Sequence, residues 1–178
     1  ATARLEYFYE TLQLVDAALE AGGPEGGQIL SPDLLDGVVV RMEAAMDDDF
    51  NTAQALGYLS DLAKLANETV KRKRKNMGRI ETLRRIREIF GIASGIFGVL
   101  GGDPGDELTR ICGLDCARAG IDPAKIEAGI AARTAARLSK DFAESDRLRD
   151  ELCGCGILLM DGPAGTQWKV SKRSGDDA

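Results

Sequence analysis

Apolar residues recur at steps of three and four along most of this chain, and that spacing places them on one face of an α-helix. The first such run covers residues 3–21, and Gly22-Gly23-Pro24 is expected to end it. After a Gly-rich loop, Ser31 is a candidate N-cap and Pro32 belongs to the first turn of a second helix. The pattern predicts amphipathic helices that pack through aliphatic side chains.

Two further helices are predicted before residue 102. Asn51-Thr52 can cap the third helix, which runs into the basic tract KRKRK at residues 71–75, and the fourth helix begins near Arg79. The expected buried positions are Ala53, Leu56, Leu59, Leu62, Ala63 and Ala66, followed by Ile80, Leu83, Ile86, Ile89 and Phe90. Four helices with short links predict an antiparallel helical bundle over residues 1–102.

The remainder of the chain predicts a smaller module. Residues 103–120 are rich in glycine and are interpreted as a linker. A helix is expected from Asp122-Pro123 to about Leu138, and another from Asp141 to about Leu152.

Two short strands close this module. They are predicted at residues 157–160 and 167–170, joined by a turn at Asp161-Gly162-Pro163. The expected fold class is therefore mainly α, with the antiparallel bundle followed by a small α+β module at residues 121–170. That module contains two helices and a short two-stranded antiparallel hairpin. Residues 171–178 are expected to form a disordered tail.

Composition and charge narrow the class of protein. The hydrophobic fraction of 44% is sufficient for a packed core, and the net charge of −6 argues against binding nucleic acid by bulk attraction. A local basic surface or the readout of individual bases is not excluded. No apolar stretch of about 18 residues and no signal peptide pattern occur, so a cytoplasmic location is expected. The chain does not begin with methionine, which suggests a piece of a longer protein.

The acidic run MDDDFNTAQAL at residues 46–56 raises the question of a metal or catalytic site. Adjacent residues of a helix point about 100° apart, so Asp47, Asp48 and Asp49 cannot all bind one ion. The glycine turn of an oxygen-ligand metal loop is also missing. A structural interpretation is favoured, in which the three acids cap the next helix at a helix–helix junction and Phe50 fills the core beside it.

Two stretches carry a pattern that belongs to a known family. AMDDDFNTAQALGYLSDLAKLAN resembles the helical-bundle segment that follows the catalytic region of the cysteinyl-tRNA synthetases, and RTAARLSKDFAESDRLRDELCGCGILLMDGPAGTQWK resembles their C-terminal anticodon-binding module. The matching positions of the second stretch are Arg133, Arg137, Lys140, Asp141, Phe142, Ala143, Asp146, Arg149, Asp150, Gly156, Ile157, Asp161, Pro163, Gly165, Thr166 and Trp168. The first segment, ARLEYFYETL, and the spacing of the stretches also suit the family, so the resemblance covers essentially the whole chain apart from residues 101–120 and the tail.

The resemblance implies that Arg137, Phe142, Asp146 and Asp161 contact the anticodon. Arg137 is expected to donate to a base edge or a phosphate, and Asp146 and Asp161 to accept from base amines. Phe142 stands where many members of the family have tryptophan, so stacking is kept and an indole N–H donor is lost. Trp168 is expected to pack within the strands.

The residues alone also allow a simpler interpretation. Arg137, Asp141, Ser145 and Arg149 fall at steps of four and are predicted to share one helical face, where their charges can simply be solvated. The basic tract can be a solvated helix end or can contact tRNA phosphates. The candidate phosphate contacts are Lys71, Arg72, Lys73, Arg74, Lys75 and Lys140.

Catalytic signatures of the family are missing. Neither an HIGH-type nor a KMSKS-type motif occurs, and histidine is absent. The sequence therefore predicts no catalytic residue, metal or cofactor here, and the resemblance implies that ATP and zinc belong to the catalytic domain of a parent class I cysteine–tRNA ligase. The expected partners are tRNA-Cys and that catalytic domain, with neither DNA nor membrane, and a monomer is expected.

Two other classes of function remain open. One is a non-catalytic helical protein-interaction domain. The other is a small metal-binding protein that uses Cys112, Cys116, Cys153 and Cys155, although the spacings CGLDC and CGC differ from paired C-x-x-C motifs and also fit ordinary reduced thiols.

Overall fold

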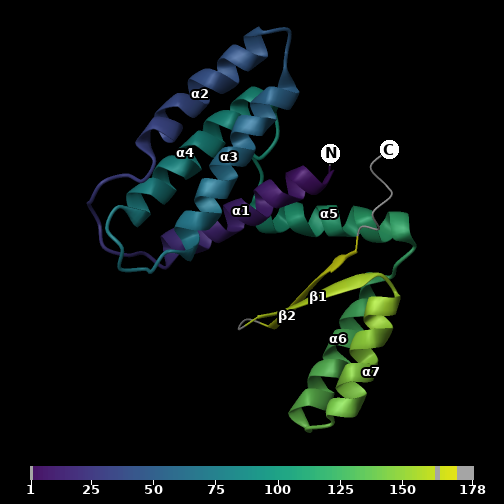
Figure 1. Ribbon diagram of the computed structural model, residues 1–178. Helices are drawn as coiled ribbons and strands as arrows, with labels where there is room; N and C mark the ends of the chain where they lie inside the picture. Colours follow the sequence, from purple (N-terminus) through teal and green to yellow (C-terminus); the bar gives the residue numbers. More distant parts are fainter. Residues whose placement is uncertain (1, 163–164, 172–178) are drawn as a thin grey trace. The chain divides into compact units, whose positions relative to one another are not determined.

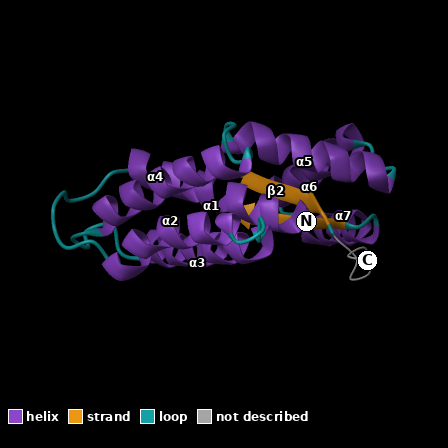
Figure 2. Ribbon diagram, turned by 90° about the horizontal axis from the view of Figure 1, so that it is seen from above, coloured by secondary structure: helices purple, strands orange, loops and turns teal. Residues whose placement is uncertain are grey.

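The computed structural model describes residues 2–162 and 165–171. Within them the chain forms seven helices and one two-stranded antiparallel hairpin (Figures 1 and 2), so the mainly α fold class is confirmed. The chain divides into two compact units, residues 1–108 and 109–178, which are described separately. No helix in the described ranges combines the length and apolar character that crossing a membrane requires.

Four helices make up the first unit. They are α1 (Thr2–Glu20), α2 (Pro32–Asp47), α3 (Thr52–Lys71) and α4 (Arg79–Phe97), and consecutive helices run in opposite directions (Figure 1). Their apolar faces meet in a core that includes Phe8, Leu12, Leu35, Met42, Leu59, Leu62, Leu83, Ile86, Ile89 and Phe90. The expected stripe of α4 is buried throughout, whereas on α3 Ala53 is exposed and Ala55 is buried in its place.

The junction between α2 and α3 differs from the prediction in two respects, the capping of α3 and the position of Phe50. The three acids do not cap α3, because Asp47 is the last residue of α2 and Asp48 is its C-cap. Asn51 caps α3 as expected, because its Oδ1 accepts from the backbone N–H of Gln54 at 3.1 Å. Asp49 and Phe50 both have φ of 54°, and this left-handed turn leaves the Phe50 side chain 76% exposed. The expectation that Phe50 fills the core is therefore wrong. The reason is that the turn directs the ring to solvent.

The start of α2 has no comparable cap. Ser31 precedes the helix as predicted, but its φ of 52° places it in the left-handed region and its side chain makes no capping hydrogen bond. Pro32 begins the helix in the position that suits its fixed φ. Ser31 therefore marks the start of α2 without capping it.

Asn51 and Ser31 provide a matched test of local stability, because only Asn51 makes a capping hydrogen bond. Replacement of Asn51 by alanine removes an acceptor from an orphan N–H of α3, so we expect a loss of about 1 kcal/mol in the free energy of unfolding. Ser31→Ala is the control, since no side-chain bond is lost there. Urea unfolding followed by far-UV circular dichroism measures both. An equal loss in the two variants would mean that the Asn51 hydrogen bond contributes nothing.

At the other end of the bundle, hydrogen bonds join the loop between α1 and α2 to the loop between α3 and α4. The Gly78 N–H donates to the Gly26 carbonyl at 2.9 Å, and Arg74 Nε donates to the Gly22 carbonyl at 3.0 Å. Thr82 Oγ1 donates to the Gly78 carbonyl at 2.6 Å and accepts from the Leu30 N–H at 2.9 Å. The loop before α2 is thereby fixed to the first turn of α4.

Residues 103–120, interpreted as a linker, contain a 16-residue helix, α5 (Pro104–Ala119). The boundary between the two compact units falls within it, after Leu108. Asp103 Oδ1 accepts from the Asp106 N–H at 3.0 Å, and Pro104 takes the first helical position. Asp103-Pro104 is a common helix-start pattern, in which an acidic cap is followed by proline. The glycines around it led to the interpretation as a linker.

The second unit continues with α6 (Pro123–Leu138), α7 (Phe142–Gly154), β1 (Ile157–Gly162) and β2 (Gly165–Val170). The strands pair antiparallel, with Leu159 opposite Trp168 and Asp161 opposite Thr166. The apolar core consists of Ile126, Ile130, Leu152 and Ile157, against which Ile121, Leu159, Trp168 and Val170 pack. One face of the hairpin is thus held against the two helices. The predicted disordered tail, apart from Ser171, lies outside the described residues, as does Pro163.

Candidate nucleic-acid interface

The two helices predicted from Asp122 to Leu138 and from Asp141 to Leu152 are present as α6 and α7, and a tight turn joins them. Helix α6 ends at Leu138, Lys140 adopts a left-handed φ of 63°, and Asp141 begins α7 by accepting from the Glu144 N–H at 3.1 Å. Arg137 therefore lies on α6, and Ser145 on α7 is buried. The prediction that Arg137, Asp141, Ser145 and Arg149 share one helical face is wrong, because the turn breaks the i,i+4 sequence.

A buried arginine lies at the centre of the site. The side chain of Arg133 on α6 is only 4% exposed, and it forms a bidentate pair with the carboxylate of Asp161 on β1. Its Nη1 donates to Oδ1 at 2.9 Å and its Nη2 donates to Oδ2 at 2.7 Å. Bidentate charge-assisted bonds of this kind fix both distance and orientation. The pair ties the end of β1 to α6.

The carboxylate of Asp161 accepts two further hydrogen bonds. Thr166, its partner across the hairpin, donates to Oδ1 at 2.7 Å, and Nη1 of Arg137 donates to Oδ2 at 3.3 Å. The bonds from Arg133 and Thr166 hold the pKa of Asp161 well below its usual range. Asp161 is therefore ionised in the folded protein at neutral pH.

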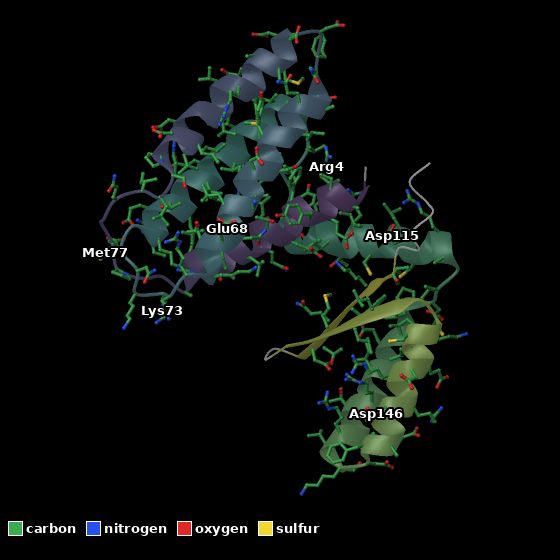
Figure 3. The ribbon with its side chains drawn as sticks, viewed as in Figure 1. Arg4, Glu68, Lys73, Met77, Asp115 and Asp146 are labelled. Atoms are coloured by element: carbon green, nitrogen blue, oxygen red, sulfur yellow. The ribbon has the colours of Figure 1, made fainter. Side chains whose placement is uncertain are left out.

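Two of the predicted contact residues are open to solvent on α7. Phe142 is 63% exposed in the first turn, and Asp146 is exposed one turn further along (Figure 3). Asp146 also lies within electrostatic reach of Arg133, because it helps to raise the pKa of that guanidinium, after the larger contribution of Asp161. The predicted set is thus distributed over α6, α7 and β1, and within it a hydrogen bond joins Arg137 to Asp161.

Sequence reasoning left Arg133 and Thr166 without a role in the site. Both appear among the positions that match the family pattern, and Arg133 stands four residues before Arg137, on the same face of α6. That spacing of four residues could have indicated that Arg133 lies beside Arg137 in the site. Trp168, by contrast, packs against the core as predicted, and its Nε1 donates to Glu127 at 2.6 Å.

The candidate phosphate contacts lie in both units. Lys71 is the last residue of α3, and residues 72–75 follow it in an exposed loop at one end of the bundle, where Figure 3 labels Lys73. Arg74 is held in that loop by its bond to Gly22. Lys140 is exposed in the turn between α6 and α7. All six side chains are open to solvent, as phosphate contacts would require.

All four cysteines carry reduced thiols, and the described residues contain no disulfide. Cys112 and Cys116 lie on α5, where Cys116 is buried, and Cys153 and Cys155 are exposed near the end of α7. In the described ranges no group of three or more His, Cys, Asp or Glu residues is arranged to hold a metal ion.

Comparison with known proteins identifies both parts of the chain. Residues 41–101 match the DALR domain, and residues 123–168 match the cysteinyl-tRNA ligase anticodon binding domain. The cysteine–tRNA ligase of Anaeromyxobacter sp. (strain Fw109-5) is 41% identical over 177 residues, which cover 96% of this chain and 34% of the relative. That of Geobacter sulfurreducens is 38% identical over 175 residues, with 96% and 35% covered.

A third relative agrees with these two. The cysteine–tRNA ligase of Anaeromyxobacter dehalogenans (strain 2CP-C) is 40% identical over 174 residues, covering 96% of this chain and 34% of its own length. The chain therefore spans about a third of the length of the curated relatives it matches, and the matched part is C-terminal.

Proposed function

The chain belongs to the cysteinyl-tRNA ligase family, and from this premise we propose that it is the tRNA-recognition part of a cysteine–tRNA ligase and binds the anticodon stem-loop of tRNA-Cys. In this proposal the full-length protein is a monomeric cytoplasmic enzyme that attaches cysteine to its tRNA in an ATP-dependent reaction. Its catalytic domain holds ATP and zinc, and the present chain contributes recognition without catalysis.

The observation that carries the proposal is the set of exposed donors, acceptors and one aromatic ring that α6, α7 and β1 present. Sequence-specific RNA recognition mostly uses unstacked loop bases, which are held by stacking and by hydrogen bonds to their edges. Arg137 is 53% exposed and has further N–H groups beyond the one that Asp161 accepts, Asp146 is an exposed acceptor, and Phe142 presents a ring to solvent. A chain of net charge −6 can therefore bind RNA selectively at this place.

Each residue has a defined role in the proposal. Arg137 donates to a base edge or phosphate, Phe142 stacks on a base, and Asp146 and Asp161 accept from base amines. Asp161 can accept from a base only when Arg137 moves away from Oδ2, since its other acceptor positions are already used. The exposed cations contact the tRNA backbone; they are Lys71, Arg72, Lys73, Arg74, Lys75 and Lys140.

Titration with two RNAs tests this function. The chain is titrated with unmodified tRNA that carries the cysteine anticodon GCA and with the same tRNA changed at the middle base, and NMR chemical-shift changes measure both affinities. By analogy with base-edge contacts in DNA, we expect the changed base to weaken binding by about 1–3 kcal/mol. Arg137→Ala and Asp146→Ala should abolish the difference, because each removes a group that reads a base edge.

Arg118→Ala is the matched control, since Arg118 is an exposed arginine on α5 that lies outside the site. This variant should keep the discrimination of the unmodified chain. If the chain bound both tRNAs equally or bound neither, the proposed function would be wrong. A stable protein complex that is indifferent to RNA would instead favour the alternative, a helical protein-interaction domain.

A further inference from the structure

The carboxylate of Asp161 is held from inside the fold before any RNA is present. An ionised carboxylate offers about four acceptor positions. Arg133 occupies two of them, and Thr166 occupies a third, at distances of 2.7–2.9 Å. The fourth position, on Oδ2, is taken by Arg137 at 3.3 Å, which is the longest of the four bonds.

The four bonds also differ in how accessible their donors are. Arg133 is buried, with its side chain 4% exposed, whereas the side chain of Arg137 is 53% exposed. Thr166 Oγ1 accepts from Arg133 Nη1 at 3.4 Å while it donates to Asp161, so these three side chains form a closed ring of bonds. The two bonds from the buried Arg133 cannot exchange with a ligand without disturbing the fold, whereas the bond from the exposed Arg137 can.

We propose that Arg133 and Thr166 are positioning residues of the recognition site, which fix the Asp161 carboxylate so that it presents a single acceptor position on Oδ2. The inference rests on the proposed function of the site. In the free protein this position orients Arg137, and in the complex Arg137 or a base amine occupies it. Neither Arg133 nor Thr166 touches RNA.

Asp146 on α7 is the second carboxylate of the site. Asp146 adds to the raised pKa of Arg133 after the larger contribution of Asp161. A recognition site discriminates best when its groups are held in place before the ligand arrives, because less ordering is then required on binding. Arg133 holds the Asp161 carboxylate in place through two charge-assisted hydrogen bonds, and Thr166 holds it through one hydroxyl hydrogen bond.

Three variants separate positioning from folding. Thr166→Val removes the hydroxyl and keeps a β-branched residue in β2. Arg133→Lys keeps the buried charge and loses the two parallel bonds. Thr134→Val is the control, because the Thr134 hydroxyl bonds only to the Ile130 carbonyl, on a neighbouring turn of α6, at 2.9 Å. Tryptophan fluorescence during urea unfolding reports whether each variant folds.

Two readouts then test the proposal on the 178-residue chain. The first is NMR relaxation of the Arg137 guanidinium nitrogens without RNA, which we expect to show increased mobility in Thr166→Val and Arg133→Lys and no change in Thr134→Val. The second is discrimination between the GCA tRNA and its middle-base variant. We expect it to fall about threefold in Thr166→Val, as for one hydrogen bond, and about tenfold in Arg133→Lys.

The outcomes distinguish this inference from the function on which it rests. If the unmodified chain discriminates and both folded variants retain its discrimination and its Arg137 mobility, the positioning role is wrong and the function stands. If the unmodified chain does not discriminate, the function is wrong, and the mobility of Arg137 still decides whether Arg133 and Thr166 order the cluster.

Discussion

Replacement of Asp161 by alanine is expected to destabilise the second unit more than replacement of Arg133 by methionine. Asp161→Ala leaves the guanidinium of Arg133 buried without its bonded carboxylate, whereas Arg133→Met leaves a carboxylate that is 44% exposed and still bonded to Thr166 and Arg137. Removal of one partner of a fully buried pair costs about 3–5 kcal/mol. Because solvent partly screens Asp161, we expect about 2–3 kcal/mol for Asp161→Ala and about 1 kcal/mol for Arg133→Met.

Trp168 makes this comparison selective. It is the single tryptophan of the chain and packs against the core of the second unit, so its fluorescence during urea unfolding reports that unit. The double variant should lose less than the sum of the two single variants, since it leaves no unpaired charge. Equal losses in the two single variants would contradict the assignment of Arg133 as the buried partner.

An exposed pair of similar geometry provides the control. Arg147 donates to both oxygens of Glu144, at 2.8 and 2.7 Å, but both side chains are largely in water. Glu144→Ala should therefore have little effect, because exposed ion pairs contribute little to stability. A loss as large as that of Asp161→Ala would show that burial is not what makes the Arg133 pair important.

The same pair predicts a pH dependence. Because the pKa of Asp161 is lower in the folded protein than its usual value of 3.8, the unfolded chain binds the proton more readily. Its contribution to stability is present above that value and is lost as the pH falls towards the folded pKa. The stability difference between the unmodified chain and Asp161→Asn should shrink below about pH 4.

Replacement of Gly78 by alanine is expected to destabilise the helical bundle by about 2–4 kcal/mol. Gly78 has a φ of 75°, which disfavours a side chain, and an added Cβ would overlap the backbone oxygen of Gln28. The loop before α2 would have to separate from the first turn of α4, and the bond from the Gly78 N–H to Gly26 would be strained. Far-UV circular dichroism during urea unfolding measures the loss.

Two other glycines separate the contributions. Gly98 has a similar φ of 66° but no atom near its added Cβ, so Gly98→Ala should show the backbone contribution alone, about 1 kcal/mol. Gly57 lies in the middle of α3 with free space around it, and Gly57→Ala should stabilise the chain by about 0.5–1 kcal/mol. If Gly78→Ala resembled Gly98→Ala, the contact between the two loops would be unimportant.

Local patterns were sufficient to predict most helices. The caps Asn51, Asp122 and Asp141 each act on the backbone N–H groups that their position in the sequence indicates. The start of α5 at Asp103-Pro104 was equally local, but the surrounding glycines led to its interpretation as a linker. The exposure of Phe50 was not predictable in this way, because it depends on the left-handed turn that the chain adopts at Asp49 and Phe50.

The sequence by itself determined the helical periodicity, the caps and the hairpin, because each depends on residues that lie within a few positions of one another. It also determined the family, because the family motifs occur in a fixed order along the chain. Through the resemblance, it also indicated Arg137, Phe142, Asp146 and Asp161 as the expected anticodon contacts. Only the tertiary structure decided that Asp161, 28 residues after Arg133, accepts from that buried arginine and from Arg137 together. The physical reason is that this meeting depends on how the hairpin packs against α6 and α7, and no spacing along the chain encodes that packing.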